Sequence, residues 1–121
     1  MQTILYIYKK CSTCKEALNF LKEQDYSFIE KEITTTPPSI PELELMLKQV
    51  HGEVKKLFNT SGILYRELSL SEKLKTMTIP QALELLTRNG MLVKRPFLLG
   101  EDFGLVGFNK KTWKEKLTNV K

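Results

Sequence analysis

Two cysteines three positions apart, Cys11 and Cys14, are the side chains of this sequence best suited to chemistry. A pair at this spacing can form a reversible disulfide, supply two metal ligands or pack as two small apolar residues. A structural zinc site needs four ligands, and His51 is the one histidine available to complete it. We therefore expect no metal site, which leaves redox chemistry and core packing to be compared.

The residues after the pair distinguish the two cysteines. Apolar residues recur there at the spacing of one helix face, namely Cys14, Ala17, Leu18 and Leu21. Cys14 should therefore face the core, whereas Cys11 precedes this stripe and falls at the start of the helix. Unpaired backbone N–H groups and the helix dipole stabilise an anion at that position, which favours a Cys11 thiolate.

The spacing also permits a reaction between the two thiols. Cysteines one helical turn apart can be joined, because a disulfide needs Cα atoms only about 4.4–6.8 Å apart. We predict Cys11 as the attacking thiol and Cys14 as the resolving thiol. Core packing alone would suit Cys14 but not Cys11.

A second set of candidate residues lies far from the cysteines in the sequence. Lys94 and Arg95 precede Pro96, and the forked donors of Arg95 suit a thiolate or an oxyanion. The alternative is a surface arginine at the entry to a strand.

The elements that position these residues are predicted from periodicity. Residues 3–8 and 26–33 are rich in β-branched and aromatic residues and predict strands, the first of them buried on both faces. Near the end of the chain, "RPFLL" and "LVGF" bracket a hairpin around residues 100–104. A strand, helix, strand order implies a parallel pair, and the hairpin adds antiparallel strands. We predict an α/β fold with a mixed sheet covered by helices.

The remaining helices are predicted from capping signals. Capping-box spacing predicts helices that start at Ser39, Ser69 and Thr78. The first should end near Val50, and the last should be closed by Asn89 and Gly90. A turn is expected around residues 59–62, and Asn109 can cap a final helix that carries Trp113 and Leu117.

Length, composition and charge restrict the setting. The chain has 121 residues, 41% of them hydrophobic, which fits one domain, 1–121. Its apolar stretches are too short for a membrane span, and a close cysteine pair suits a reducing compartment, so we expect a cytoplasmic monomer. The net charge of +5 is concentrated in the last twelve residues, which hold five lysines and one glutamate. No direct nucleic-acid binding is expected from such a tail.

Four segments together resemble the arsenate reductase (ArsC) family, which includes the Spx transcriptional regulators. They are "YKKCSTC" at 8–14, "NTSGILYREL" at 59–68, "GMLVKRP" at 90–96 and "LVGF" at 105–108. The resemblance implies a thioredoxin-like fold with a four-stranded mixed sheet, formed by about residues 1–38 and 91–121, with a helical insertion at about 39–90. It also implies a cis peptide bond before Pro96.

The resemblance further implies which residues form the site. Members that reduce arsenate use one cysteine, glutathione and glutaredoxin, and bind the oxyanion with three arginines. By position, Cys11 matches the catalytic cysteine and Arg95 matches the arginine before the proline. Asn59 stands where a second arginine would fall, with Arg66 as a displaced substitute, and Gly107 stands near the third.

Four further residues complete the predicted site as substrate-binding or supporting groups: Tyr8, Ser12, Thr13 and Pro96. Two of the predicted residues also have a purely structural explanation. Asn59 can belong to a turn, and Tyr8 can pack at the end of a strand.

The resulting hypothesis is a thiol-disulfide oxidoreductase that reduces arsenate or a protein or small-molecule disulfide. Glutathione with glutaredoxin, or thioredoxin, would supply electrons, and no tightly bound cofactor is expected. The alternative is an Spx-like redox-sensing regulator that binds the C-terminal domain of the RNA polymerase α subunit.

Overall fold

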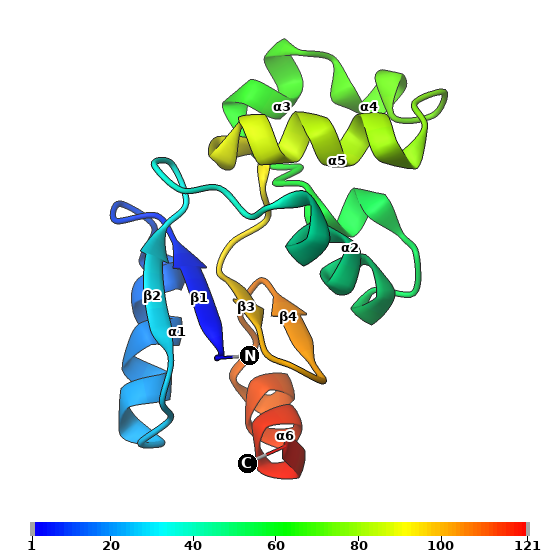
Figure 1. Ribbon diagram of the computed structural model, residues 1–121. Coiled ribbons are helices and arrows are strands. Elements are labelled where there is room, and N and C mark those ends of the chain that lie inside the picture. Colours follow the sequence, from blue (N-terminus) through cyan, green and yellow to red (C-terminus); the bar gives the residue numbers. More distant parts are fainter. Residues whose placement is uncertain (1, 121) are drawn as a thin grey trace.

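A four-stranded mixed sheet forms the centre of the computed structural model, which describes residues 2–120 and the side chains of residues 2–118 (Figure 1). The strands are β1 (Ile4–Ile7), β2 (Ile29–Glu32), β3 (Phe97–Leu99) and β4 (Gly104–Val106), in the spatial order β2-β1-β3-β4. β1 pairs in parallel with β2 and antiparallel with β3, and β3 pairs antiparallel with β4. The predicted mixed sheet, with its parallel pair and terminal hairpin, is confirmed.

Alternation along the central strands divides the core in two. Leu5 and Ile7 of β1 belong to one apolar cluster, whereas Tyr6 between them belongs to the other. β3 repeats the alternation, since Leu98 joins the first cluster and Phe97 joins the second. Successive side chains of a strand point to opposite faces, so each central strand is buried on both sides, as its apolar run predicts.

Two helices cover the first face. They are α1 (Ser12–Glu23) and α6 (Lys110–Val120). Buried residues of α1 share a cluster with Trp113 and Leu117 of α6. The predicted cap of α6 is confirmed, because the Thr112 backbone N–H donates to Asn109 Oδ1 at 3.0 Å. The indole N–H of Trp113 donates to the Gly107 carbonyl at 3.0 Å, which ties α6 to the end of β4.

The chain between β2 and β3 is helical and covers the second face. Its elements are α2 (Ile40–Gln49), the 3-10 helix η1 (Val54–Leu57), α3 (Ile63–Glu67), α4 (Leu70–Lys73), α5 (Ile79–Arg88) and the 3-10 helix η2 (Gly90–Leu92). In Figure 1, α3, α4 and α5 form a layer above one end of the sheet. The Tyr6 hydroxyl donates to Glu42 Oε1 at 2.7 Å, which fastens α2 to the central strand.

The capping predictions in this segment are confirmed at two of three sites. Ser39 and Thr78 form complete capping boxes at the starts of α2 and α5. A helix does start after Ser69, as predicted, but the capping box is absent, because this residue has φ 54° and its side chain accepts no capping hydrogen bond. A capping side chain needs an extended backbone at the cap, and Ser69 instead turns the chain sharply from α3 into α4.

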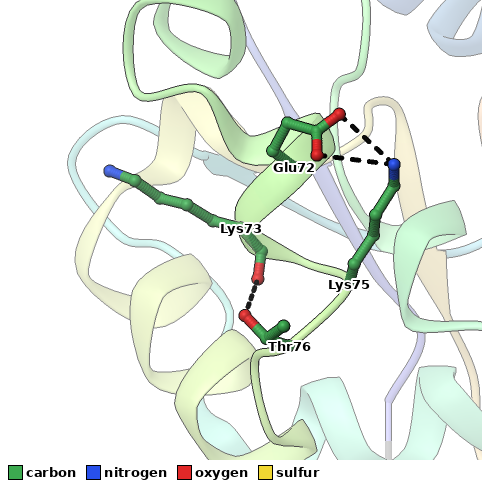
Figure 2. Close-up of polar contacts among 4 residues, drawn as sticks. All are labelled: Glu72, Lys73, Lys75 and Thr76. Carbon is green, nitrogen blue, oxygen red and sulfur yellow. Dashed lines mark hydrogen bonds and ion pairs between the residues drawn. The ribbon is translucent and has the colours of Figure 1, made fainter.

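The helix α4 is correspondingly short. Just beyond it, the Lys75 ammonium contacts both carboxylate oxygens of Glu72, at 3.2 and 3.4 Å, and the Thr76 hydroxyl donates to the Lys73 carbonyl at 3.4 Å (Figure 2). These local contacts close the turn before α5 begins. Glu72, the predicted partner of Ser69 in a capping box, therefore serves the end of the helix rather than its start.

One predicted strand is too long, and one helix was not predicted. Strand β2 spans Ile29–Glu32, so residues 26–28 and Ile33 lie outside it, and the helix α3 follows the predicted turn at 59–62 where no helix was expected. At five residues, α3 is too short to show helical periodicity. Asn89 does end α5, but Gly90 starts η2 and packs against the main chain, where a Cβ would collide with the carbonyl oxygen of Ile33.

Candidate functional site

The strand register brings the predicted site residues to one end of the sheet. Tyr6 of β1 is paired with Phe97 of β3, which is paired with Val106 of β4. The carboxyl ends of β1 and β4 and the amino end of β3 therefore lie together, at the end nearest the inserted helices (Figure 1). Two backbone hydrogen bonds fix the adjoining loops, from Cys11 N–H to the Tyr8 carbonyl at 3.0 Å and from Gly107 N–H to the Pro96 carbonyl at 2.9 Å.

Cys11 is the N-cap of α1. Its backbone is extended, with φ −93° and ψ 114°, and its sulfur accepts the backbone N–H of Cys14 at 3.3 Å. The first N–H groups of a helix have no partner within the helix, and here a sulfur takes the place of the oxygen that usually caps them. The side chain is half-buried, so Cys11 combines access to solvent with a donor that stabilises negative charge on its sulfur.

Cys14 lies one helical turn after Cys11, in the first turn of α1, and has a different environment. It is fully buried on the apolar face of α1, and both cysteines are free thiols. Burial, followed by the hydrogen bond with Cys11, raises the pKa of Cys14 to about 12, against smaller opposing effects of the Tyr8 backbone and the Arg95 charge. Cys14 is therefore protonated at neutral pH, while its backbone N–H holds the Cys11 sulfur at 3.3 Å.

Arg95 approaches the cysteines from the β3 side. Its guanidinium carbon lies 5.0 Å from the centre of the Tyr8 ring, and Nη1 donates to the Met91 carbonyl at 3.3 Å. Nε is buried and has no hydrogen-bond partner within residues 2–120. The peptide bond between Arg95 and Pro96 is cis, the state that the resemblance to thioredoxin-like proteins implies. The arginine is thus held by its neighbours, while its buried Nε–H stays unpaired within the described residues.

The remaining predicted residues differ in their relation to this centre. Ser12 is exposed and Thr13 half-buried in the first turn of α1, immediately after Cys11. The Asn59 backbone N–H donates to the Leu92 carbonyl at 2.7 Å, so its segment runs beside the one that leads to Arg95. Asn59 also accepts the N–H of Gly62 at 3.1 Å, which is the predicted turn.

Arg66 does not join the centre through any polar contact that the described chain provides. It is exposed on α3, and its side chain makes no hydrogen bond or ion pair within residues 2–120. The structure therefore gathers Tyr8, Cys11, Cys14, Arg95 and Pro96, flanked by the first turn of α1, while the second and third arginine positions of the resemblance hold no arginine.

One group that contacts a site residue was not predicted from the sequence. The Met91 carbonyl orients the Arg95 guanidinium, and a backbone oxygen leaves no signal in the residue type. Among the described residues, no three His, Cys, Asp or Glu side chains are grouped to hold a metal ion. Over the same stretch, no helix has the length and apolar character needed to cross a membrane.

Known proteins resemble this chain along most of its length. It is 41% identical over 115 residues to the uncharacterised protein YusI of Bacillus subtilis, covering 95% of this chain and 98% of that one. It is 26% identical over 106 residues to the global transcriptional regulator Spx of Listeria innocua, covering 88% and 79% of the two chains.

Solved structures and the family profile agree with these relatives. The structure of a possible arsenate reductase from Streptococcus mutans superposes with a TM-score of 0.83 at 36% identity, covering 89% of this chain and 92% of that one. The predicted thioredoxin-like α/β fold is thereby confirmed. The sequence profile of the ArsC family matches residues 6–116. The chain therefore belongs to the ArsC family.

Proposed function

We propose that this protein is a thiol-disulfide oxidoreductase in which Cys11 attacks and Cys14 resolves. The observation that carries the proposal is the 3.3 Å hydrogen bond from the Cys14 backbone N–H to the Cys11 sulfur, with the buried Cys14 thiol beside it. The first cysteine can be reached by a substrate and has support for a thiolate. The second is fully buried, so a substrate cannot reach it directly.

The proposed reaction balances as an exchange of disulfides. The Cys11 thiolate attacks a substrate disulfide, forms a mixed disulfide and releases one substrate thiol. The sulfur of Cys14, on losing its proton, then attacks Cys11 and releases the second thiol. The two cysteines end as a disulfide, and two electrons have passed to the substrate. Glutathione with glutaredoxin, or thioredoxin, would return the protein to its dithiol form without a tightly bound cofactor.

We favour a disulfide over arsenate as the acceptor. A tetrahedral oxyanion is bound well when several charged donors converge on it. Arg95 lies at the cysteines, whereas Arg66 and Arg88 are exposed on α3 and α5, and Arg88 pairs there with Glu84. Arsenate remains an acceptor to assay, because the protein belongs to the ArsC family.

A turnover assay tests this function. Wild-type protein with 2-hydroxyethyl disulfide, or with arsenate, is supplied with glutathione, glutathione reductase and glutaredoxin, or with thioredoxin and its reductase. NADPH consumption above that of the same mixture without the protein is followed. Cys11→Ser should abolish turnover. Cys14→Ala should stop at a mixed disulfide on Cys11 that mass spectrometry detects. Circular dichroism controls for folding of both variants, and a wild type that turns over none of these acceptors would contradict the proposal.

The second candidate is a redox-sensing regulator, favoured by the similarity to Spx along 88% of the chain. Here the same disulfide would alter a surface that binds the C-terminal domain of the RNA polymerase α subunit in the cytoplasm. Pull-down with that domain should then recover the protein in one redox state and not in the other. Equal recovery in both states, or recovery unchanged by Cys14→Ala, would exclude this mode of sensing.

A further inference from the structure

A cavity of about 570 Å³ lies beside the residue that precedes Arg95. Its apolar lining comes from Phe58, after η1, and from Val106 of β4. Its polar lining comes from Glu53, Lys55, Lys56, Thr60 and Lys94. Two of the segments that line it, around Phe58 and around Lys94, are hydrogen-bonded to each other. Phe58 makes a β-bridge with Val93, and the Lys94 N–H donates to the Leu57 carbonyl at 2.8 Å. The inserted segment and the sheet therefore build this cavity together.

The lysines leave the cavity with an excess of positive charge. Lys56 is paired with Glu53 at 2.7 Å. Lys55 and Lys94 have no ion-pair partner among residues 2–120, so two ammonium groups remain for a ligand. Lys94 is half-buried, and its stem passes close to Gly107, where an added Cβ would lie 3.1 Å from the lysine Cε. Two free cations beside an apolar surface suit an acidic group carried on an organic body.

The cavity and the reactive thiol lie at the same end of the sheet but towards its two faces, since Phe58 and Val106 pack with the cluster of the inserted helices and Cys11 packs with the cluster of α1. Val106 is in register with Phe97, which is in register with Tyr6, and Cys11 follows the strand that contains Tyr6. Neighbouring strands are about 4.8 Å apart, so two strand spacings separate the cavity wall from β1, or roughly 10 Å. An extended peptide covers that distance in about three residues.

We propose that this cavity binds an acidic side chain of a peptide disulfide substrate, about three residues from the cysteine that Cys11 attacks. The inference rests on the proposed oxidoreductase function and adds its substrate class. In the step concerned, the Cys11 thiolate bonds to the peptide sulfur, and the old S–S bond breaks to release the other half as a thiolate. The cavity holds the peptide during this exchange and takes no part in the bond changes.

Two peptide probes that differ only in charge test this assignment. One is acetyl-Glu-Ala-Ala-Cys-Ala-Ala-Glu-amide and the other has Gln in place of both Glu, each as a mixed disulfide with 2-thiopyridine. Attack by Cys11 on the peptide sulfur releases 2-thiopyridone, whose absorbance gives the second-order rate constant. Exposed ion pairs contribute up to about 1 kcal/mol each, so wild type should react about three- to tenfold faster with the Glu probe.

Charge variants locate the source of this preference. Lys94→Gln and Lys55→Gln should each reduce it, and the double variant should bring the ratio of rates to about one. Lys22→Gln is the matched control, because it removes the same charge from an exposed site in the last turn of α1, about 16 Å along the helix from Cys11. The Lys22→Gln protein should keep the wild-type ratio.

The outcomes separate this inference from the function on which it rests. Equal rates for the two probes with wild type, both dependent on Cys11, would overturn the cavity assignment and leave the oxidoreductase proposal intact. An equal loss of preference in Lys22→Gln would also overturn the assignment, since net charge alone would then explain it. Failure of both probes to react would contradict the oxidoreductase function and with it the inference.

Discussion

The two thiols illustrate how much chemistry a single helical turn can separate. Cys11 caps α1 and is half-buried, whereas Cys14 is fully enclosed by apolar neighbours such as Ala17 and Leu21. Burial disfavours a thiolate, while N–H donors and a nearby guanidinium favour one. A substrate can therefore reach the sulfur of Cys11, whereas the sulfur of Cys14 is closed to it.

Selective alkylation should report this difference. At pH 8, iodoacetamide should modify Cys11 of the reduced protein, while Cys14 stays unmodified because it is buried and its pKa is raised to about 12. Peptide mass spectrometry at several time points gives the rate for each cysteine. In guanidinium chloride both cysteines should react at similar rates, and similar rates in the native protein would contradict the assigned environments.

Oxidation should join the two thiols within one molecule. Mild oxidant should remove two thiol hydrogens and form the Cys11–Cys14 disulfide, because the two cysteines are one helical turn apart and the Cys14 backbone N–H already donates to the Cys11 sulfur at 3.3 Å. Alkylation followed by intact-mass measurement checks this. Two alkylated cysteines after oxidant treatment, or a disulfide-linked dimer as the main product, would be the contrary result.

At the scale of elements, Tyr6 connects the sheet to the inserted helices. Its hydroxyl donates to Glu42, which also completes the capping box of α2 with Ser39. Tyr6→Phe removes a buried hydrogen bond to a charged group, and we expect about 1.5–3 kcal/mol less free energy of unfolding. Urea denaturation measures the change. Ser39→Ala, which removes only the cap, should cost about 1 kcal/mol, and a larger loss there than for Tyr6→Phe would be inconsistent with this anchor.

The close approach of Gly90 to Ile33, the residue that follows strand β2, is a second constraint on the elements. Gly90→Ala would place a Cβ against the Ile33 carbonyl, a backbone atom that cannot turn aside, so we expect a loss of several kcal/mol or failure to fold. Gly62→Ala meets the movable side-chain amide of Asn59 at 2.8 Å and the Asn59 backbone oxygen at 3.3 Å, and should cost much less. Thermal unfolding of the two variants compares them, and equal melting temperatures would contradict the predicted collision.

These elements also show which features are predictable from residue patterns. The capping boxes at Ser39 and Thr78 and the cap at Asn109 depend on residues a few positions apart, and all three are present. Ser69 has the same local pattern but turns the chain between two short helices, and tertiary packing decides such turns. Likewise, the contact of Gly90 with Ile33 joins positions 57 residues apart, which no local pattern specifies.

At the scale of the whole molecule, the site forms where three parts of the chain meet: the cysteine motif after β1, the 3-10 helix η2 with Met91, and the residues just before Pro96. The cysteine motif and the residues before Pro96 were predictable as parts, because each has its own signal. Their mutual geometry depends on the pairing of β1 with β3 and on the Met91 carbonyl beside Arg95. The grouping of the cavity lysines had no signal in the sequence, since Lys55 and Lys94 are brought together by the bridge between Phe58 and Val93 and by the hydrogen bond from the Lys94 N–H to the Leu57 carbonyl.

The whole molecule should lose stability in alkaline solution for a reason that these sites share. Cys14, with a pKa raised to about 12, and Tyr6, with a pKa raised by burial and by Glu42, keep their protons in the folded state. In the unfolded chain both groups ionise above about pH 9 and pH 10 respectively. The unfolded state then binds fewer protons, so the free energy of unfolding falls as pH rises, by at most about 1.4 kcal/mol per pH unit for each group. Urea denaturation of the reduced protein between pH 8 and about pH 11 should show this decline, and the Cys14→Ala, Tyr6→Phe double variant should show a shallower one. A double variant with the wild-type slope would assign the decline to other groups.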